Sequence, residues 1–364
     1  MNNNTSSNFF LSVNSPNGVF SIFKELYKPN DDWFCYILKG GPGTGKSTLM
    51  KKIAEKSIAK GNYTELIHCS SDPNSLDAVI IPCLKTAIVD GTSPHTLDPT
   101  FPGLSDTVIN LCDCWNSKKL LKHKSALLDL YQKNKSFHDT SKKYLHAYGQ
   151  IYKEMKKIIE NCTLKNEIST YCEKFSKKIF KNSSSSICSE KLRFISSITP
   201  SGHICFEESL ISQADKIFII EDNFSVVGNL ILQNLRNIAL NHRLNITTCL
   251  QPLAPDKEIE AIIIPELKVA FKLENPKALP LKLKNKIEYK KISTKKFLNT
   301  TELSKHKNLI ALNREICKEL LYKSVNNLHN ALLIHNEIEE FYKSSMNYSK
   351  LDKISDKLLS KIFI

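Results

Sequence analysis

The chain has 364 residues, 41% of them hydrophobic, which suits two domains of ordinary size, each with its own core. No run of about 18 apolar residues occurs, which excludes a membrane-spanning helix, and the first residues lack the pattern of a secretory signal. The eleven cysteines include no CxxC pair, so we expect reduced thiols and a cytoplasmic protein. The formal net charge of +14 favours an anionic partner, although a lysine-rich composition alone is weak evidence.

The first half begins with a segment, Phe9 to Phe20, that carries a Pro-x-Gly turn. An apolar strand at Tyr36 to Leu38, a glycine-rich loop and an amphipathic helix from about Ser47 to Lys60 come next. Further apolar strands are expected at Thr64 to Cys69, Ala78 to Ile81 and Ala87 to Val89. Strands that alternate with helices predict a mostly parallel sheet flanked by helices.

The glycine-rich loop matches the pattern G-x-x-x-x-G-K-[ST] from Gly40 to Ser47. Such glycines let backbone N–H groups point inward at phosphate oxygens, while Lys46 supplies a mobile positive charge and Ser47 a hydroxyl for Mg²⁺. The helix that follows adds the positive end of its dipole. We therefore expect ATP and Mg²⁺ as cofactors, bound by the loop residues Gly40, Gly41, Pro42, Gly43, Thr44, Gly45, Lys46, Ser47 and Thr48.

Acidic residues follow two of the predicted strands. Asp90 ends an apolar strand, at the edge where ligands bind in such sheets, and is our expected Walker-B-like magnesium ligand beside Ser47. Asp72 and Asp77 follow another strand, where either could orient water, and we expect Asp72 to join Lys46 and Asp90 in catalysis. Asp72 before a proline is equally a good turn former, and Asp90 before Gly91 has the same alternative. His95 fits either a position near the γ-phosphate or a surface role.

A long helical section, about 118–180, ends the first half. Its apolar residues recur every three or four positions, as do those of a second section at about 302–363, which indicates helix packing in a hairpin or small bundle beside each sheet. The recurring residues are Leu145, Tyr148, Tyr152, Met155 and Ile159, and Leu328, Leu332, His335, Ile338 and Tyr342.

The sequence contains an internal repeat. "DAVIIPCLKTAI" (77–88) resembles "EAIIIPELKVAF" (260–271), "FFLSVNSPNGVF" (9–20) resembles "FISSITPSGHICF" (194–206), and the matches share an offset near 183 residues. We therefore expect a tandem duplication: an active P-loop NTPase-like domain at 1–185 with its helical arm at 118–180, and a degenerate repeat at 191–364 with its arm at 302–363.

The second copy lacks the predicted site. At the constant offset Gly40 becomes Asp222, Lys46 becomes Gly228 and Ser47 becomes Asn229, while Asp90 becomes Leu273. The phosphate loop, its cation and its metal ligand are lost together, so the second half should keep the fold without binding a nucleotide in the usual way.

All four arginines lie in the second half. Phosphoryl transfer often uses an arginine to neutralise charge in the transition state. Arg193 and Arg236 are the candidates for such a role across the interface, and surface or packing roles are the alternative.

The motifs "ILKGGPGTGKSTLMKKI", "IHCSSDPNSLDAVIIP", "AIVDGTSPHTLDP" and "ITPSGH" resemble those of the duplicated P-loop ATPase-like proteins of Firmicutes. The resemblance covers nearly the whole chain and implies ATP binding in a cytoplasmic bacterial protein. It implies P-loop domains in both halves, and this sequence departs from that in its second half. The resemblance supplies no substrate.

Three functions are compatible with these features of the sequence. The first is a Mg²⁺-dependent ATPase with one working site, with ATP favoured over GTP because no guanine-reading NKxD motif follows the loop. The second is a small-molecule or nucleotide kinase, which the absence of arginines from the first half disfavours. The third is binding of nucleic acid or an acidic partner through Lys118–Lys181, where sixteen lysines oppose six acidic residues; a solvated helical face is the alternative.

Overall fold

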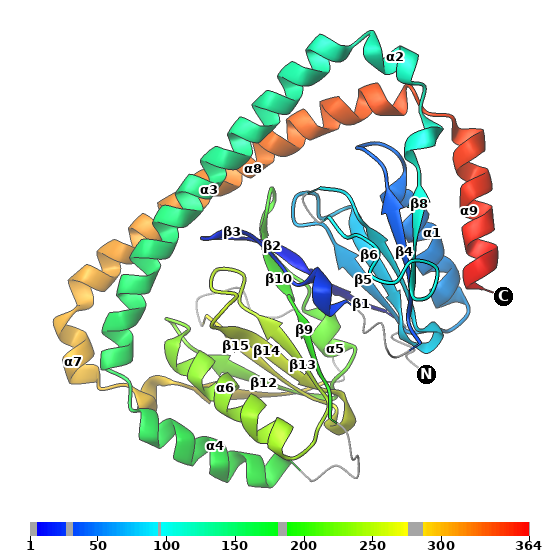
Figure 1. The fold of residues 1–364 in the computed structure, drawn as a ribbon. Helices are drawn as coiled ribbons and strands as arrows, with labels where there is room; N and C mark the ends of the chain where they lie inside the picture. The colour runs from blue at the N-terminus through cyan, green and yellow to red at the C-terminus, as the bar shows by residue number, and fades with distance from the viewer. Residues whose placement is uncertain (1–5, 27–31, 94–95, 181–187, 276–286, 364) are drawn as a thin grey trace.

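The computed structural model describes residues 6–26, 32–93, 96–180, 188–275 and 287–363. It contains two six-stranded sheets, one from each half, as expected for a tandem α/β protein (Figure 1). The first sheet has the order β1 (Ser6–Phe9), β5 (Thr64–His68), β6 (Leu76–Ile81), β7 (Thr86–Asp90), β4 (Phe34–Lys39) and β8 (Asp106–Asn110). The second has the order β16 (Glu288–Ser293), β12 (Lys216–Glu221), β15 (Val269–Glu274), β14 (Ile259–Ile264), β13 (Ile246–Leu250) and β9 (Glu190–Arg193).

Both sheets are mostly parallel, as expected, and each contains one antiparallel strand, β6 in the first sheet and β14 in the second. In the first sheet β5 pairs antiparallel with β6, and β6 with β7, while β1, β4, β7 and β8 make parallel pairs. The connection from β6 to β7 is a single 3-10 turn, Pro82–Leu84, closed by Lys85 with a positive φ of 46°. So short a connection joins only antiparallel neighbours, because a parallel crossover needs a dozen or more residues. The turn Pro265–Leu267 does the same in the second sheet.

Apolar residues explain why the central strands sit inside. Every residue of β6 and β14 is buried, and the helices α1 (Lys46–Ala59) and α6 (Val226–Asn241) pack against them. The two Pro-x-Gly turns, one in each half, form the tips of small hairpins, with positive φ at Gly18 and Gly202. The hairpins and short helices are β2 (Ser12–Ser15), β3 (Gly18–Ser21), β10 (Ser196–Thr199), β11 (Gly202–Cys205), η1 (Phe23–Glu25), α5 (Glu208–Ile211), η3 (Cys112–Cys114) and η5 (Lys295–Phe297).

The two halves share one core around an approximate two-fold axis. Phe10 and Phe194 are equivalent residues, and each donates a backbone hydrogen bond to the carbonyl of the other, at 2.8 and 3.0 Å. Both phenylalanines are buried in a cluster that draws on both sheets. The halves are therefore fused by apolar packing rather than joined by a free linker.

Each half ends in a short helix, a long helix and a final helix. These are α2 (Ser117–Leu121), α3 (Lys124–Asn161) and α4 (Lys165–Ile179), and α7 (Thr300–Lys305), α8 (Lys307–Lys343) and α9 (Tyr348–Ile362). The expected hairpin beside each sheet is wrong: α3 and α8 lie side by side along their length (Figure 1). A helix of 38 residues is about 57 Å long. Its apolar stripe needs a partner of equal length, which the other copy provides.

The final helices exchange sheets. Ile168 and Cys172 of α4 belong to the same core as Ile231 of α6 in the second half, and Leu358 of α9 belongs to that of Ile53 in the first half. Each sheet with its covering helices therefore contains residues from both predicted domains. In the part of the chain that the structure describes, no helix is both long and apolar enough to cross a bilayer.

Candidate functional site

The glycine-rich loop, Gly40–Ser47, leaves the carboxyl end of β4 and enters α1. Because β4 and β7 are parallel and Leu38 pairs with Asp90, Asp90 lies at the same edge of the sheet as the loop. The amide of Gly91 donates to the carbonyl of Leu38 at 3.0 Å, which fixes the end of β7 against β4. The predicted position of Asp90 at the carboxyl edge is therefore confirmed.

Glycines are required in this loop by its shape. Gly43 and Gly45 have φ values of 66° and 80°, which residues with a Cβ rarely adopt. A Cβ on Gly40 would lie 2.6 Å from Oγ1 of Thr44, whose hydroxyl donates to the carbonyl of Gly41 at 2.8 Å. The loop is therefore a tight curl of backbone.

Lys46 and Asp90 meet beneath the loop. The ammonium of Lys46 donates to the carbonyls of Gly40 and Gly41 and lies 3.5 Å from Oδ2 of Asp90. The side chains of Lys46 and Asp90 are only 12% and 18% exposed, so solvent screens this pair little. The other carboxylate oxygen of Asp90 accepts from the amide and hydroxyl of Thr92.

Ser47 faces the adjoining strand as well as the loop. Its hydroxyl oxygen accepts a hydrogen bond of 3.0 Å from the amide of Leu76, the first residue of β6. The loop, α1 and β6 are thereby tied together at one corner. Lys46 and Asp90 thus meet at the sheet edge, and Ser47, the residue after Lys46, is tied to the start of β6 at the same edge.

A fourth group belongs to this cluster. Ala78 of β6 pairs with Val89 of β7, which places Asp77 next to Asp90 across the two strands. Asp77 is buried, and burial, followed by the negative charge of Asp90, raises the pKa of its carboxyl to about 7. The sequence identified Asp77 only as an alternative to Asp72 for orienting water. The antiparallel pairing of β6 and β7, which brings Asp77 to Asp90, was not expected.

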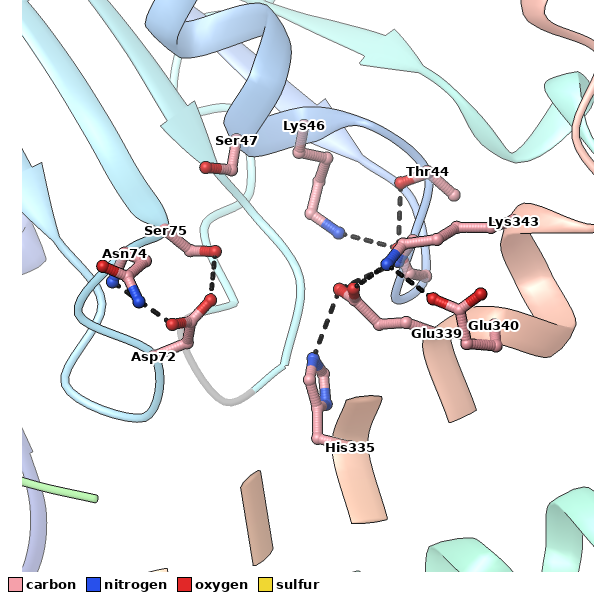
Figure 2. A network of polar contacts seen from close by, with 12 residues as sticks. Thr44, Lys46, Ser47, Asp72, Asn74, Ser75, His335, Glu339, Glu340 and Lys343 are labelled. Carbon is pink, nitrogen blue, oxygen red and sulfur yellow. Dashed lines mark hydrogen bonds and ion pairs between the residues drawn. The ribbon is translucent and has the colours of Figure 1, made fainter. Parts of the chain in front are cut away.

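Asp72 has a different environment. Figure 2 shows its carboxylate turned toward its own loop, where it accepts from the hydroxyl of Ser75 at 2.5 Å and from the amide of Asn74 at 3.2 Å. These are the bonds of a turn former, the alternative noted for this residue. His95 lies outside the described residues.

The end of α8, from the second half, covers the glycine-rich loop (Figure 2). The amide of Gly43 donates to Oε1 of Glu339 at 3.3 Å, and the ammonium of Lys343 lies 3.0 Å from Oε2 of the same carboxylate. His335 Nε2 is 3.5 Å from Oε1. Hydrogen bonds from His335 and then Lys343 lower the pKa of Glu339 to about 2 against the opposing effect of burial.

Aromatic side chains hold α8 in this place. Trp115 and Tyr342 both pack against Gly41, and their rings meet edge to face with centroids 5.4 Å apart. Leu351 of α9 contacts the Gly45 position. The sequence predicted packing for His335 and Tyr342, but nothing in it distinguished Glu339 from an ordinary charged residue on a helix surface.

The equivalent segment of the second half, Asp222–Gly228, enters its helix earlier: α6 begins at Val226, the counterpart of Thr44, whereas α1 begins at Lys46. Ser225 has a φ of 60°, close to the 66° of its counterpart Gly43. Asn229 accepts from the amide of Ile259 at 2.9 Å, as Ser47 does from Leu76, so these two residues hold equivalent positions in the two halves. A Cβ on Gly228 would lie 2.2 Å from Leu273 Cδ1, so this pair is the apolar counterpart of Lys46 and Asp90.

The Asp222 carboxylate binds backbone amides of its own loop, Asp222–Gly228. Its two carboxylate oxygens accept from the amides of Phe224 and Gly228, at 2.9 and 2.8 Å, and the residue is buried. Amides of the kind that would bind phosphate oxygens are thus satisfied by a side chain of the same loop.

The two arginine candidates are engaged elsewhere. Arg193 donates through Nε and Nη2 to Oε2 of Glu65, at 2.9 and 2.8 Å, in a buried pair between the halves. Arg236 pairs with Glu190. Neither guanidinium group is directed at the glycine-rich loop, and the basic side chain of the second half that does lie there is Lys343.

The lysine-rich section Lys118–Lys181 exposes charge but few aromatic rings. Tyr148 is buried, and Tyr152 stacks on it with ring centroids 5.4 Å apart, so these tyrosines pack inward. An open groove of about 760 Å³ lies where α2 and α9 begin, and its lining includes Lys118, Lys119 and Lys350 with Trp115.

Comparisons with protein-family models, with curated proteins and with solved structures found no match to this chain.

Proposed function

We propose that the protein binds ATP with Mg²⁺ at the glycine-rich loop and hydrolyses it at this one site. The observation that supports the proposal is the convergence of Lys46, Ser47 and Asp90 at the carboxyl edge of the first sheet. This is the edge at which ligands bind in open α/β sheets. The resemblance of the loop motif to P-loop ATPases supports the same reading.

Each group has a role that its chemistry suits. The curl of glycine backbone and the start of α1 offer N–H groups and a positive dipole to phosphate oxygens. Lys46, held by loop carbonyls and Asp90, is a cation that bound phosphates would draw toward themselves. Ser47 and Asp90 would hold Mg²⁺, which favours oxygen ligands and takes the rest from phosphate and water.

The metal would depend on the nucleotide. Within the described residues, no group of three or more His, Cys, Asp or Glu side chains forms a metal-binding cluster. Two protein ligands, a hydroxyl and a carboxylate, match the usual way in which Mg²⁺ is held beside substrate phosphates rather than in an all-protein cage. We therefore expect Mg²⁺ to bind together with ATP and not before it.

The test is hydrolysis of Mg-ATP by the full chain and by Lys46→Ala. We expect the variant to lose about 10²-fold or more of the activity, which is typical for loss of one preorganised electrostatic group. Lys52→Ala is the matched control, because Lys52 lies on the same helix with an exposed side chain. Equal activity of the wild type and Lys46→Ala would overturn the proposal.

A second candidate function, binding of nucleic acid, is favoured by the lysine groove at the start of α2 and α9. At the constant offset its Lys118, Lys119 and Lys350 correspond to Thr301, Glu302 and Glu167 in the other half. Positive charge is therefore gathered at the end of the molecule that carries the glycine-rich loop. DNA or RNA binding that weakens steeply with salt would support it, and no binding at low salt would remove it.

A further inference from the structure

A carboxylate stands at each of the two equivalent loops. In the second half Asp222 satisfies two amides of its own loop. In the first half the corresponding position is Gly40, which has no side chain, and the carboxylate comes instead from Glu339 on α8. It accepts from Gly43, a residue of the motif whose amides are expected to bind phosphate.

The Glu339 carboxylate is held there by its neighbours. His335 and Lys343 lie one turn before and one turn after it on α8, and both contact its oxygens. The side chain of Glu339 is 27% exposed, so the charge is partly withdrawn from solvent. A negative charge at 3.3 Å from a loop amide has the position and the sign of a bound phosphate oxygen.

This arrangement is specific to the end of α8. At the constant offset His335, Glu339 and Lys343 correspond to Tyr152, Lys156 and Glu160 on α3, so both charges are reversed. Lys156 pairs with Glu258, the residue before β14. The two long helices therefore carry opposite charges at equivalent positions, and α8 is the one that brings a carboxylate to the loop with Lys46.

The fit between α8 and the loop is also tight. A Cβ on Gly43 would lie 2.9 Å from the backbone carbonyl of Glu339 and 3.2 Å from Cγ of Lys343. A triphosphate that takes the Gly43 amide must therefore displace the Glu339 carboxylate, because two anions at one donor repel each other.

We infer that Glu339 is an autoinhibitory stand-in for phosphate, which holds the end of α8 on the glycine-rich loop until nucleotide displaces it. The inference rests on the proposed function. Displacement breaks the hydrogen bond between the Gly43 amide and the Glu339 carboxylate, which frees the end of α8 from the loop. Because α8 pairs with α3 along its length, release of its end carries the state of the loop to the helical arm.

The first experiment measures the affinity of the full chain for Mg-ATP by calorimetry. Glu339→Gln removes the charge and keeps the shape, so we expect it to bind Mg-ATP about fivefold to tenfold tighter than the wild type. Glu339→Asp keeps the charge but shortens the side chain and should fall between the two. Glu340→Gln is the matched control, since Glu340 contacts Lys343 but is 73% exposed, and its affinity should equal that of the wild type.

The second experiment follows the end of α8 directly. Trp115 packs on Gly41 and Tyr342, and Trp33→Phe leaves it as the single tryptophan. Mg-ATP should change the Trp115 fluorescence of this variant, and Glu339→Gln in the same background should show a large part of that change before ATP is added.

The outcomes separate the two ideas. If the wild type binds Mg-ATP and Glu339→Gln binds it equally or more weakly, the inference fails and the proposed function stands. If neither the wild type nor Glu339→Gln binds Mg-ATP, both are overturned. If only Glu339→Gln binds, or if it binds more tightly while Glu340→Gln does not, both are supported.

Discussion

Ser141 of α3 and Ser324 of α8 share a hydrogen bond across the buried seam of the arm, with their hydroxyl oxygens 2.7 Å apart. They are equivalent residues of the two copies, separated by 183 positions. A residue that meets its own counterpart lies on the symmetry axis of an isologous contact. The arm is therefore paired as a two-chain dimer would be, within a single chain.

This contact makes a first prediction. Ser141→Ala leaves the buried hydroxyl of Ser324 without its partner and should cost about 1–2 kcal/mol in free energy of unfolding. The double variant Ser141→Ala, Ser324→Ala removes both hydroxyls and should cost less than the sum of the single changes. Urea denaturation of the four proteins gives the cycle, and strict additivity would show that the two hydroxyls do not interact.

The sequence predicted the helices and strands of the site region better than it predicted which elements pack against one another. The strand before the loop, the helix after it and the strand that ends in Asp90 are all in place, because apolar runs and turn residues act locally. The exchange of α4 and α9 between sheets was not predictable from periodicity. The helical pattern indicates that Leu358 is buried, but it does not indicate which of the two sheets the side chain packs on. The strand β8 was missed because only alternate residues of Asp106–Asn110 are shielded from solvent.

The site shows the same division. Lys46, Ser47 and Asp90 follow from motif and strand polarity, which are properties of short segments. Asp77 reaches Asp90 through the antiparallel pair of β6 and β7, which the expectation of a mostly parallel sheet did not identify. Glu339 comes from a position almost 300 residues further along the chain, and a charged residue on a helix carries no local sign of what it touches.

A second prediction concerns the buried ion pair between the halves. Glu65→Gln leaves Arg193, 3% exposed, without a counter-charge and should cost about 3–5 kcal/mol in free energy of unfolding. Replacing both, as in Glu65→Leu with Arg193→Met, should recover most of that loss, because no charge is then buried. Chemical denaturation measures both effects. Asp215→Asn is the control, because it breaks the exposed pair with Lys268 and should change stability by less than about 1 kcal/mol.

A third prediction uses the pKa of Asp77, which is raised to about 7 in the folded protein from an ordinary value of 3.8. The folded state then binds more protons than the unfolded state between these values, so the contribution of Asp77 to stability is full below about pH 4 and is lost as pH rises toward 7. Asp77→Asn stays neutral at every pH. It should therefore gain stability relative to the wild type between pH 5 and about pH 8.

Denaturation of the wild type and Asp77→Asn at several pH values checks this. The difference in free energy of unfolding should shift in favour of the variant as pH rises and should level off above the folded pKa. A difference that does not change with pH would show that the carboxyl group is not buried beside Asp90 as described.

A fourth prediction follows from the exchange of helices. Leu358 belongs to α9, the last helix of the second copy, but packs in the core of the first sheet with Leu49 and Ile53 of α1. Leu358→Ala should cost about 2–4 kcal/mol, as truncation of a buried leucine does. The loss should appear first in α1 and the loop, because those are the elements that the side chain covers, although they lie some 300 residues away in the sequence.

Hydrogen exchange resolved by segment locates the effect. Amides of α1 should exchange faster in Leu358→Ala, while amides of α6 in the second half keep their protection. Lys357→Ala, an exposed neighbour on α9, should leave both segments unchanged. Faster exchange in α6 instead of α1 would mean that α9 packs on the sheet of its own half. Weaker packing of α9 on α1 should also lower the affinity for Mg-ATP, because Leu351 of the same helix packs against Gly45.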